Sequence, residues 1–311
     1  MSGHQPTFSV VIPTRDRFAQ LATCLAALAE QDYAHDAFDV IVVNDASDQA
    51  VPAEIEAFAD RITLTIINQP TPTGPGIARN NGADRATGRF VAFTDDDCAA
   101  APDWLAKLAV HFAETPDQLV GGRVINALRQ NPYATASHII LDVVYDYYDP
   151  RQGRAHFFPT SNFALPRNRF SEIGGFSAGW PLAAAEDREF CFQWLQHGWP
   201  MSHAREAIVY HRHDLGLSSF CQLHFKYGRG AYHYHRLRVD KAGAGGLRPD
   251  WGFYWSCLSY AWRRFPKSQT ATLVALLGLW QFSNAAGYFW QRSQKITPRL
   301  TRPTSEASHS L

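Results

Sequence analysis

Short apolar runs alternate with segments of helical periodicity through the first third of the chain, and this alternation restricts the fold more than any other feature. The first run, Phe8 to Ile12, is rich in β-branched residues and stops at Pro13, as expected of a buried parallel strand. Apolar residues then recur at helical spacing from Phe18 to Leu28, before a second β-rich run from Val40 to Val43. This order of elements predicts a βαβ unit.

The same alternation continues further along the chain. We expect a helix from Ala53 to Ala59, a strand from Ile62 to Ile67, a helix from Ile77 to Arg85 and a strand from Phe90 to Phe93. Strands separated by helices of this size predict an α/β fold with a mostly parallel sheet and helices on both faces. Ligands of such sheets bind outside the carboxyl ends of the strands.

Later periodicity predicts two more helices and leaves the segment between them unassigned. Pro102 suits the first turn of a helix that runs to about Ala113. A second helix is expected from Glu186 to Gly198, where glycine favours a C-terminal stop. The best linker candidate is Ala242 to Gly246. We therefore predict three parts, an α/β domain, a helical segment and a flexible tail, over residues 1–240, 241–295 and 296–311.

Polar residues follow three of the predicted strands. Asp45 follows the second strand, where it can accept hydrogen bonds from the base or ribose of a nucleotide. An Asx turn that caps the next helix explains Asp45 equally well. The other two groups are Pro13, Thr14 and Arg15 after the first strand, and Asp95, Asp96 and Asp97 after the fourth. Because the carboxyl ends of parallel strands share one edge of the sheet, we expect these groups to meet.

Three consecutive acidic residues after a strand predict a bound cation. Neighbouring carboxylates repel one another unless a cation offsets their charge or their protonation shifts. On an extended chain, Asp95 and Asp97 point the same way and Asp96 points elsewhere, so two carboxylates can face one ion. Oxygen ligands favour Mg²⁺ or Mn²⁺, which also bind diphosphate oxygens. A solvated acidic turn is the alternative.

A glycine-rich turn leads into a helix at Thr73 to Gly82, upstream of the acidic loop. It lacks the Gly-Lys-Ser/Thr ending of a P-loop. Glycines at a helix N-terminus let a phosphate or an acidic loop approach closely, and Arg79 can bridge to either. We therefore include Arg79 among the candidate donor-binding residues.

Four motifs taken together resemble the nucleotide-binding half of family 2 glycosyltransferases, which have the GT-A fold. In order, they are Val-Val-Ile-Pro-Thr-Arg-Asp-Arg, Val-Val-Asn-Asp-Ala-Ser, Gly-x-x-x-Ala-Arg-Asn-x-Gly and Phe-Thr-Asp-Asp-Asp. The resemblance covers about residues 8–230. It implies that Asp45 binds the base and that the loop with Asp95 and Asp97 binds metal and ribose.

The resemblance also implies a catalytic carboxylate further along the chain. Gly174-Gly175-Phe176, followed by Glu186 and Asp187, is similar to the G-G-F and E-D motifs of the family. By this analogy Asp187 is the base, and Glu186 binds the acceptor or orients the site. The dipole of the helix favours an ionised Asp187, which can then accept a proton from an acceptor hydroxyl. Without the other motifs, two acids that cap a helix would be the preferred interpretation.

Histidine and basic residues are expected to complete the site. His211 follows an apolar strand after the base helix, and by resemblance it is the third metal ligand. His213, two residues further on, is the rival candidate. Lys226 and Arg229 resemble the basic segment that follows this histidine in the family, where they would neutralise the leaving diphosphate. Surface residues that merely favour solubility are an equally good explanation for these two.

Charge, cysteine content and the first residues exclude several classes of protein. Lys plus Arg and Asp plus Glu both number 29, so no net field favours nucleic acid. The five cysteines are scattered, which argues against a zinc ribbon or a disulfide framework. Residues Met1 to Thr7 lack the apolar core of a signal peptide. We therefore expect a cytoplasmic protein.

The segment from Ser268 to Gln291 contains no charged residue, and basic residues flank it on both sides. It is long enough to span a bilayer, but Gln281, Ser283 and Asn284 would be unfavourable against lipid. The favoured interpretation is peripheral contact with the inner surface of the cytoplasmic membrane, followed by a buried helix. Such contact would suit a lipid-linked or surface-glycan acceptor.

The sequence therefore predicts an inverting glycosyltransferase that moves a sugar from a nucleotide diphosphate sugar to an acceptor hydroxyl on a glycan or lipid-linked molecule. The predicted ligands of Mn²⁺ or Mg²⁺ are Asp95, Asp97 and His211. The residues expected to bind the donor are Pro13, Thr14, Arg15, Asp45, Arg79, Asp95, Asp96, Lys226 and Arg229. The alternatives are a sugar nucleotidyltransferase, disfavoured because no glycine-rich phosphate loop follows the first strand, and a non-catalytic membrane-associated scaffold of the same fold.

Overall fold

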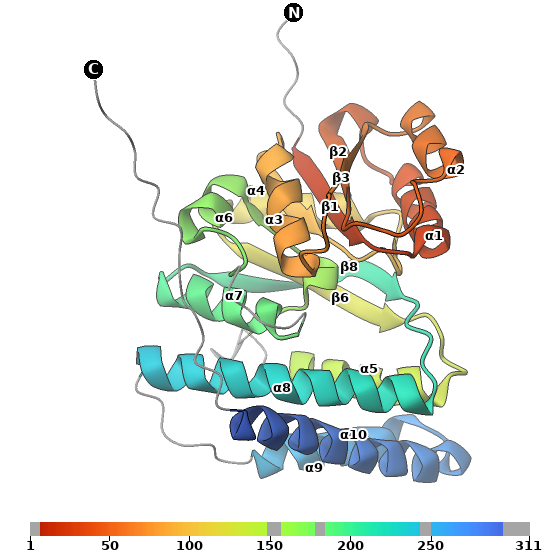
Figure 1. The fold of residues 1–311 in the computed structure, drawn as a ribbon, viewed down its shortest axis with the longest axis vertical. Coiled ribbons are helices and arrows are strands. Elements are labelled where there is room, and N and C mark those ends of the chain that lie inside the picture. Colours follow the sequence, from red (N-terminus) through yellow and green to blue (C-terminus); the bar gives the residue numbers. More distant parts are fainter. Residues whose placement is uncertain (1–6, 148–156, 178–183, 243–249, 295–311) are drawn as a thin grey trace, which may run out of the picture.

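An eight-stranded sheet runs through the part of the chain that the structure describes (Figure 1). This computed structural model describes residues 7–147, 157–177, 184–242 and 250–294. The strand order is β3-β2-β1-β4-β7-β6-β8-β5. The strands are β1 (Phe8–Thr14), β2 (Phe38–Asn44), β3 (Leu64–Asn68), β4 (Phe90–Phe93), β5 (Cys98–Ala100), β6 (Leu119–Asn126), β7 (Phe163–Pro166) and β8 (Met201–His211).

The first four strands pair in parallel, as predicted, and the other half of the sheet is mixed. β1 lies between β2 and β4, and Thr14 at its end is opposite Asn44. β7 runs antiparallel to both β4 and β6, whereas β6 and β8 are parallel. β5 pairs antiparallel with β8, and this pairing sets Cys98 opposite His211. The acidic loop before β5 is thereby brought to the end of β8.

Helices cover both faces of the sheet, and alternate strand residues point to the two layers. Val10 and Val40 pack toward α1 and α4, whereas Val11 and Ile41 pack toward α3, α6 and α7. The predicted helices and strands of the first hundred residues are present, each displaced by no more than a few residues. The helices over the sheet are α1 (Phe18–Ala29), α2 (Ala53–Glu56), α3 (Pro75–Arg85), α4 (Trp104–Glu114), α6 (Arg167–Ile173) and α7 (Glu186–Gln196).

Four further helices form a separate layer below the sheet in Figure 1: α5 (Pro132–Tyr147), α8 (Leu217–Ala242), α9 (Trp251–Arg264) and α10 (Lys267–Ser293). They share one apolar core, to which α5 contributes Ile139, α8 contributes Phe220 and α10 contributes Leu277 and Trp280. The predicted helical segment over 241–295 thus packs on helices from earlier in the chain. The boundary at residue 240 stays a prediction.

Two predictions concern segments that the structure describes only in part or not at all. The linker candidate Ala242 to Gly246 lies outside the described residues after Ala242, and so do the tail over 296–311 and the first six residues. Of the helices in the described ranges, none is both long enough and apolar enough to cross a membrane. The uncharged run forms most of α10, whose Leu273, Leu277 and Trp280 are buried in the helical core.

Helices α8 and α10 contact each other through their backbones at two glycines. A Cβ atom at Gly228 would overlap the carbonyl oxygen of Asn284, and one at Gly287 would overlap the carbonyl oxygen of Phe225. We therefore expect Gly228→Ala and Gly287→Ala each to lower the free energy of unfolding by about 1–3 kcal/mol, because the helices must move apart. Urea denaturation of the purified variants measures this change.

Gly278, also on α10, provides the matched control. A Cβ atom at Gly278 would have no neighbour within 4 Å. Gly278→Ala should therefore leave stability unchanged or raise it by about 0.5–1 kcal/mol, because alanine is the better helix former. Equal midpoints for Gly287→Ala and Gly278→Ala would contradict the close helix contact.

Candidate functional site

A cavity of about 1370 Å³ lies at the carboxyl ends of the parallel strands and extends down to the helical layer. Its walls bring together polar groups from segments far apart in the sequence. Of the predicted site residues, Arg229 alone does not line it. Those that do are Pro13, Thr14, Arg15, Asp45, Arg79, Asp95, Asp96, Asp97, Glu186, Asp187, His211 and Lys226, together with the rival candidate His213.

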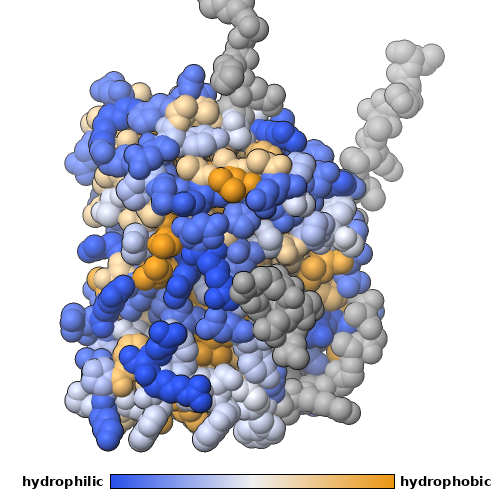
Figure 2. Space-filling view, turned by 180° about the vertical axis from the view of Figure 1, so that it is seen from behind, coloured by the Kyte–Doolittle hydropathy of each residue, from blue (hydrophilic) through white to orange (hydrophobic). Residues whose placement is uncertain are grey.

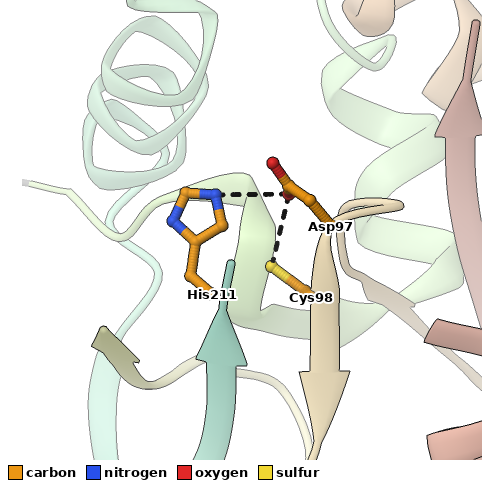
Figure 3. A group of neighbouring side chains, drawn as sticks. All are labelled: Asp97, Cys98 and His211. Atoms are coloured by element: carbon orange, nitrogen blue, oxygen red, sulfur yellow. Dashed lines mark hydrogen bonds and ion pairs between the residues drawn. The ribbon is translucent and has the colours of Figure 1, made fainter. Parts of the chain in front are cut away.

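Asp97 and His211 face each other across the β5–β8 pairing (Figure 3). Oδ1 of Asp97 lies 3.2 Å from Nε2 of His211. Burial raises the pKa of Asp97, but His211 and Arg17 outweigh burial and hold that pKa below its ordinary value. Burial lowers the pKa of His211, and the hydrogen bond and charge of Asp97 reverse this and raise it. The carboxylate is therefore ionised and faces an imidazole nitrogen.

This pair fits a divalent cation. Neighbouring ligands of an octahedral ion with bonds near 2.1 Å are about 3.0 Å apart, close to the observed separation. The Sγ atom of Cys98 lies 3.9 Å from Oδ1 of Asp97 and completes a group whose ligand atoms lie within 4.8 Å of one another. Burial raises the pKa of the Cys98 thiol well above its usual range, so this thiol stays protonated. The donor set that suits a hard cation is Asp97 with His211.

The acidic loop forms a turn and is not extended as predicted. The backbone N–H of Cys98 donates to the carbonyl oxygen of Asp95 at 3.1 Å. Asp95 consequently faces Arg79, 2.5 Å away, and is not in the group formed by Asp97 and His211. The expected alternation, with Asp95 and Asp97 facing one ion, is thus corrected for this conformation. The role of Asp95 as a ligand stays a prediction.

Arg17 is a site residue that the sequence analysis did not single out. Its guanidinium lies 3.2 Å from Asp96 and 2.5 Å from Asp97, so it offsets the charge of both carboxylates. Asp96 also accepts a hydrogen bond from Thr14 at 2.8 Å. Arg17 is the last residue of the first family motif, so the sequence could have singled it out. Its partners Asp96 and Asp97 lie in the loop between β4 and β5, and the sequence alone does not show that Arg17 contacts them.

Asp45 fixes the glycine-rich turn that precedes α3. Its carboxylate accepts hydrogen bonds from the backbone N–H groups of Thr73 at 2.7 Å and Gly74 at 2.8 Å, and from the side chain of Gln69. These partners are more than twenty residues away, so the local Asx turn considered above is not the reason for this residue. Asp45 lines the cavity as well, and base recognition stays a prediction.

The two acids at the start of α7 have different surroundings. Glu186 lies 3.4 Å from the buried guanidinium of Arg79, which also binds Asp95. The carboxylate of Asp187 accepts a hydrogen bond from the backbone N–H of Arg188 at 2.8 Å. Burial, and then the charge of Glu186, raise the pKa of Asp187 to about 7. The helix dipole favours the ionised form of Asp187, whereas burial and the like charge of Glu186 favour the protonated form.

The two predicted basic residues of α8 lie in different places. Lys226 lines the cavity, and burial lowers its pKa, partly offset by Glu186. Nε of Arg229 donates to Gln291 at 2.9 Å, and its guanidinium lies over the ring of Trp290. Contacts with α10 therefore hold Arg229 away from the cavity, which Lys226 lines.

Residues 9–180, more than half of the chain, match the family model described as glycosyl transferase family 2. The chain belongs to this family. Validoxylamine A glucosyltransferase from Streptomyces hygroscopicus subsp. jinggangensis is 27% identical over 233 residues, which cover 66% of this chain and 55% of the relative. Pre-mycofactocin glycosyltransferase from Mycobacterium tuberculosis is 27% identical over 233 residues, covering 72% of this chain and 46% of the relative.

The fold of this family 2 chain is similar to that of a solved glycosyltransferase. A mannosyltransferase from Pyrobaculum calidifontis, in complex with GDP-Man and Mn²⁺, superposes with a TM-score of 0.65 at 17% identity over 94% of this chain and 89% of that one. The predicted family and GT-A fold are thereby confirmed. The chain spans about half the length of the curated relatives it matches.

Proposed function

We propose that this family 2 chain transfers a sugar from a nucleoside diphosphate sugar to an acceptor hydroxyl, with inversion at the anomeric carbon. The observation that carries the proposal is that Asp45, the Asp97–His211 pair and Asp187 line one cavity. Two related sequences that are named as glycosyltransferases support the proposal. So does a mannosyltransferase structure of similar fold, solved in complex with GDP-Man and Mn²⁺. The acceptor hydroxyl belongs to a glycan or a lipid-linked molecule in this proposal.

In the proposed mechanism, Asp97 and His211 would hold a divalent cation, Mn²⁺ or Mg²⁺, and Asp95 is a further candidate on the same loop. When bound, this ion supplies positive charge to the diphosphate oxygens. Lys226 lines the same cavity and adds charge on the side of Glu186. In this proposal Asp45, whose carboxylate fixes the backbone of residues 73 and 74, binds the nucleoside.

Asp187 acts as the general base in this proposal. Its carboxylate accepts the proton of the acceptor hydroxyl while that oxygen forms a bond to the anomeric carbon and the bond to the diphosphate oxygen breaks. One displacement of this kind inverts the configuration and requires no covalent sugar intermediate. Arg79 forms ion pairs with Asp95 and Glu186. In this proposal Asp187, the neighbour of Glu186 in the first turn of α7, is therefore the carboxylate that is available to the acceptor hydroxyl.

The raised pKa of Asp187 predicts the pH dependence of transfer. A base must be unprotonated, so kcat/KM should be constant above pH 7 and fall about tenfold per unit as the pH drops below about 7. Glu186→Gln removes the like charge and should move this limb to lower pH, because one cause of the raised pKa is lost. A profile that is flat from pH 5 to 8 would count against Asp187 as the base.

A panel of UDP-, GDP- and TDP-sugars tests the proposed function. Thermal unfolding with Mn²⁺ should show a higher Tm with the cognate donor than with the others, because a ligand that binds the native state stabilises it. Incubation with that donor, labelled in the sugar, and a mixture of glycans and lipid extracts should release the nucleoside diphosphate. Release of pyrophosphate from a nucleoside triphosphate would instead indicate a nucleotidyltransferase, and an absence of stabilisation by every donor would indicate a scaffold.

A further inference from the structure

Helix α9 carries a row of exposed apolar side chains, here called the α9 stripe: Trp251, Trp255, Leu258 and Trp262. They are exposed by 75%, 70%, 36% and 68%, respectively. Spacings of four, three and four residues place them within about 60° of one another around the helix. The opposite side of α9 contributes the buried Cys257 and Ala261 to the helical core. The α9 stripe is therefore not needed to hold the helix on the protein.

The charged residues within α9 and α10 are all basic, and the acidic residue next to the α9 stripe is Asp250, the N-cap of α9. No acidic residue occurs between Trp251 and Gln294. Arg263, Arg264 and Lys267 are exposed at the end of α9 and the start of α10. In Figure 2 the lower end of the molecule, where α9 and α10 lie in Figure 1, is pale over much of its area, the colour of side chains in the middle of the hydropathy scale. This end of the molecule combines indole rings with positive charge.

The α9 stripe is continuous with the cavity that holds the candidate site. Trp251 and Leu258 line this cavity, as does Phe289 of α10, which is 55% exposed. The same cavity wall includes Val274, Leu277 and Trp280 of α10. Apolar side chains of the two exposed helices and the proposed base therefore line one cavity.

We infer that the α9 stripe docks this protein on the surface of an anionic lipid bilayer, with the helix parallel to the membrane plane. Tryptophan prefers the boundary between lipid headgroups and hydrocarbon, and exposed arginine and lysine bind anionic headgroups. A protein partner would not explain why the stripe shares a cavity with Asp187, whereas a lipid-borne acceptor would reach that cavity from the bilayer. This last step rests on the proposed function; the docking itself does not.

The location differs from the membrane contact expected from the sequence. That expectation concerned residues 268–291, because they contain no charge. Leu273, Leu276 and Leu277 of this run are buried against other helices of the layer. Phe282, Phe289 and Trp290 of the same run are exposed, but the four aligned apolar side chains of the stripe belong to α9, whose tryptophans score as nearly neutral on hydropathy scales.

Sedimentation with vesicles of phosphatidylcholine, with and without phosphatidylglycerol, tests this inference on the full chain. The protein should bind the anionic vesicles, and Trp255→Gln with Trp262→Gln should lower the partition coefficient about a hundredfold, roughly tenfold for each indole withdrawn from the interface. Neither tryptophan lines the cavity. The matched control is Val110→Gln with Leu217→Gln, both 55% exposed on other helices, which should bind as the wild type does.

A second pair of variants tests the charge. Arg263→Gln with Lys267→Gln should weaken binding to vesicles that contain phosphatidylglycerol and leave binding to neutral vesicles unchanged. Calorimetry with UDP and Mn²⁺ should give the same Kd for all variants and the wild type. If neither the wild type nor any variant bound UDP, this result would count against the proposed function and would leave the docking inference unaffected.

Two outcomes would overturn the docking inference. One is wild-type protein that stays in the supernatant with both kinds of vesicle, or a tryptophan double variant that sediments as the wild type does. The other is a wild-type dimer on size-exclusion chromatography that the tryptophan substitutions convert to a monomer, because the stripe would then be an interface between copies of this chain.

Discussion

Replacing Asp187 with asparagine is expected to lower kcat for sugar transfer by about 10²- to 10⁴-fold, the range typical of a lost general base. Asparagine preserves the size of the side chain but cannot accept the proton of the acceptor hydroxyl. The Kd for the donor should stay within a factor of about two, because the cation site at Asp97 and His211 is unchanged. Discontinuous assays of sugar transfer measure kcat, and calorimetry on the same preparation measures the Kd for the donor.

The matched control for Asp187→Asn is Glu54→Gln. Glu54 is also an acid in the first turn of a helix, α2, but it is exposed and lies outside the cavity. Its replacement should leave kcat unchanged. If Asp187→Asn retained wild-type transfer, or lost donor binding together with transfer, Asp187 would not be the base.

Replacing Asp97 with alanine should remove the dependence of nucleotide affinity on Mn²⁺. Loss of a carboxylate that binds the ion is expected to weaken UDP binding at saturating Mn²⁺ by about a hundredfold or more. His211→Ala should have a similar effect, since its Nε2 lies 3.2 Å from the same carboxylate. Calorimetric titration of UDP with and without Mn²⁺ measures both.

His213→Ala is the control that separates the two histidine candidates. Its ring lies beside that of His211, with the centroids 5.1 Å apart, but His213 is not in the group formed by Asp97, Cys98 and His211. Burial, and then the charge of His211, lower its pKa to about 4. UDP affinity should therefore remain dependent on Mn²⁺ in this variant. Unchanged affinity in Asp97→Ala would refute the cation site.

The parallel half of the sheet was predictable because its signals are local. Each strand from Phe8 to Phe93 is a short apolar run, and each intervening helix has its own periodicity. The region from Leu119 to Pro166 was not predictable in the same way. Strand β6 contains Gly121 and Gly122, against which Phe158 and Asn162 pack closely, so its stability depends on contacts that no sequence window shows.

The candidate site was predictable as a set of residues but not as a geometry. Family motifs led to Asp45, Asp97 and Asp187, and the structure places all three on one cavity. The contact between Asp97 and His211 arises from the register of β5 on β8, a pairing across more than one hundred residues. Arg229 was assigned to the donor by its resemblance to the basic segment of the family, yet its side chain packs against α10 and does not line the cavity.

Burial explains the remaining differences. The sequence suggested an ionised Asp187 at a helix start, whereas enclosure in the cavity raises its pKa to about 7. The same limitation affected the C-terminal run, which appeared to be the membrane-facing segment because it lacks charge. Its leucines form the core of the helical layer, whereas its Phe282, Phe289 and Trp290 are exposed, as is the α9 stripe. Hydropathy gives the composition of a segment, but not the side on which it packs.

A crystal structure with Mn²⁺ and the nucleoside diphosphate of the donor that the panel identifies, in which the ion is located by its anomalous scattering, tests the central claim most directly. We expect one strong anomalous peak within bonding distance of Asp97 and His211, diphosphate oxygens on the same ion, and the base beside Asp45. An ion and nucleotide bound elsewhere, with Asp97 and His211 still paired only with each other and Arg17, would contradict it.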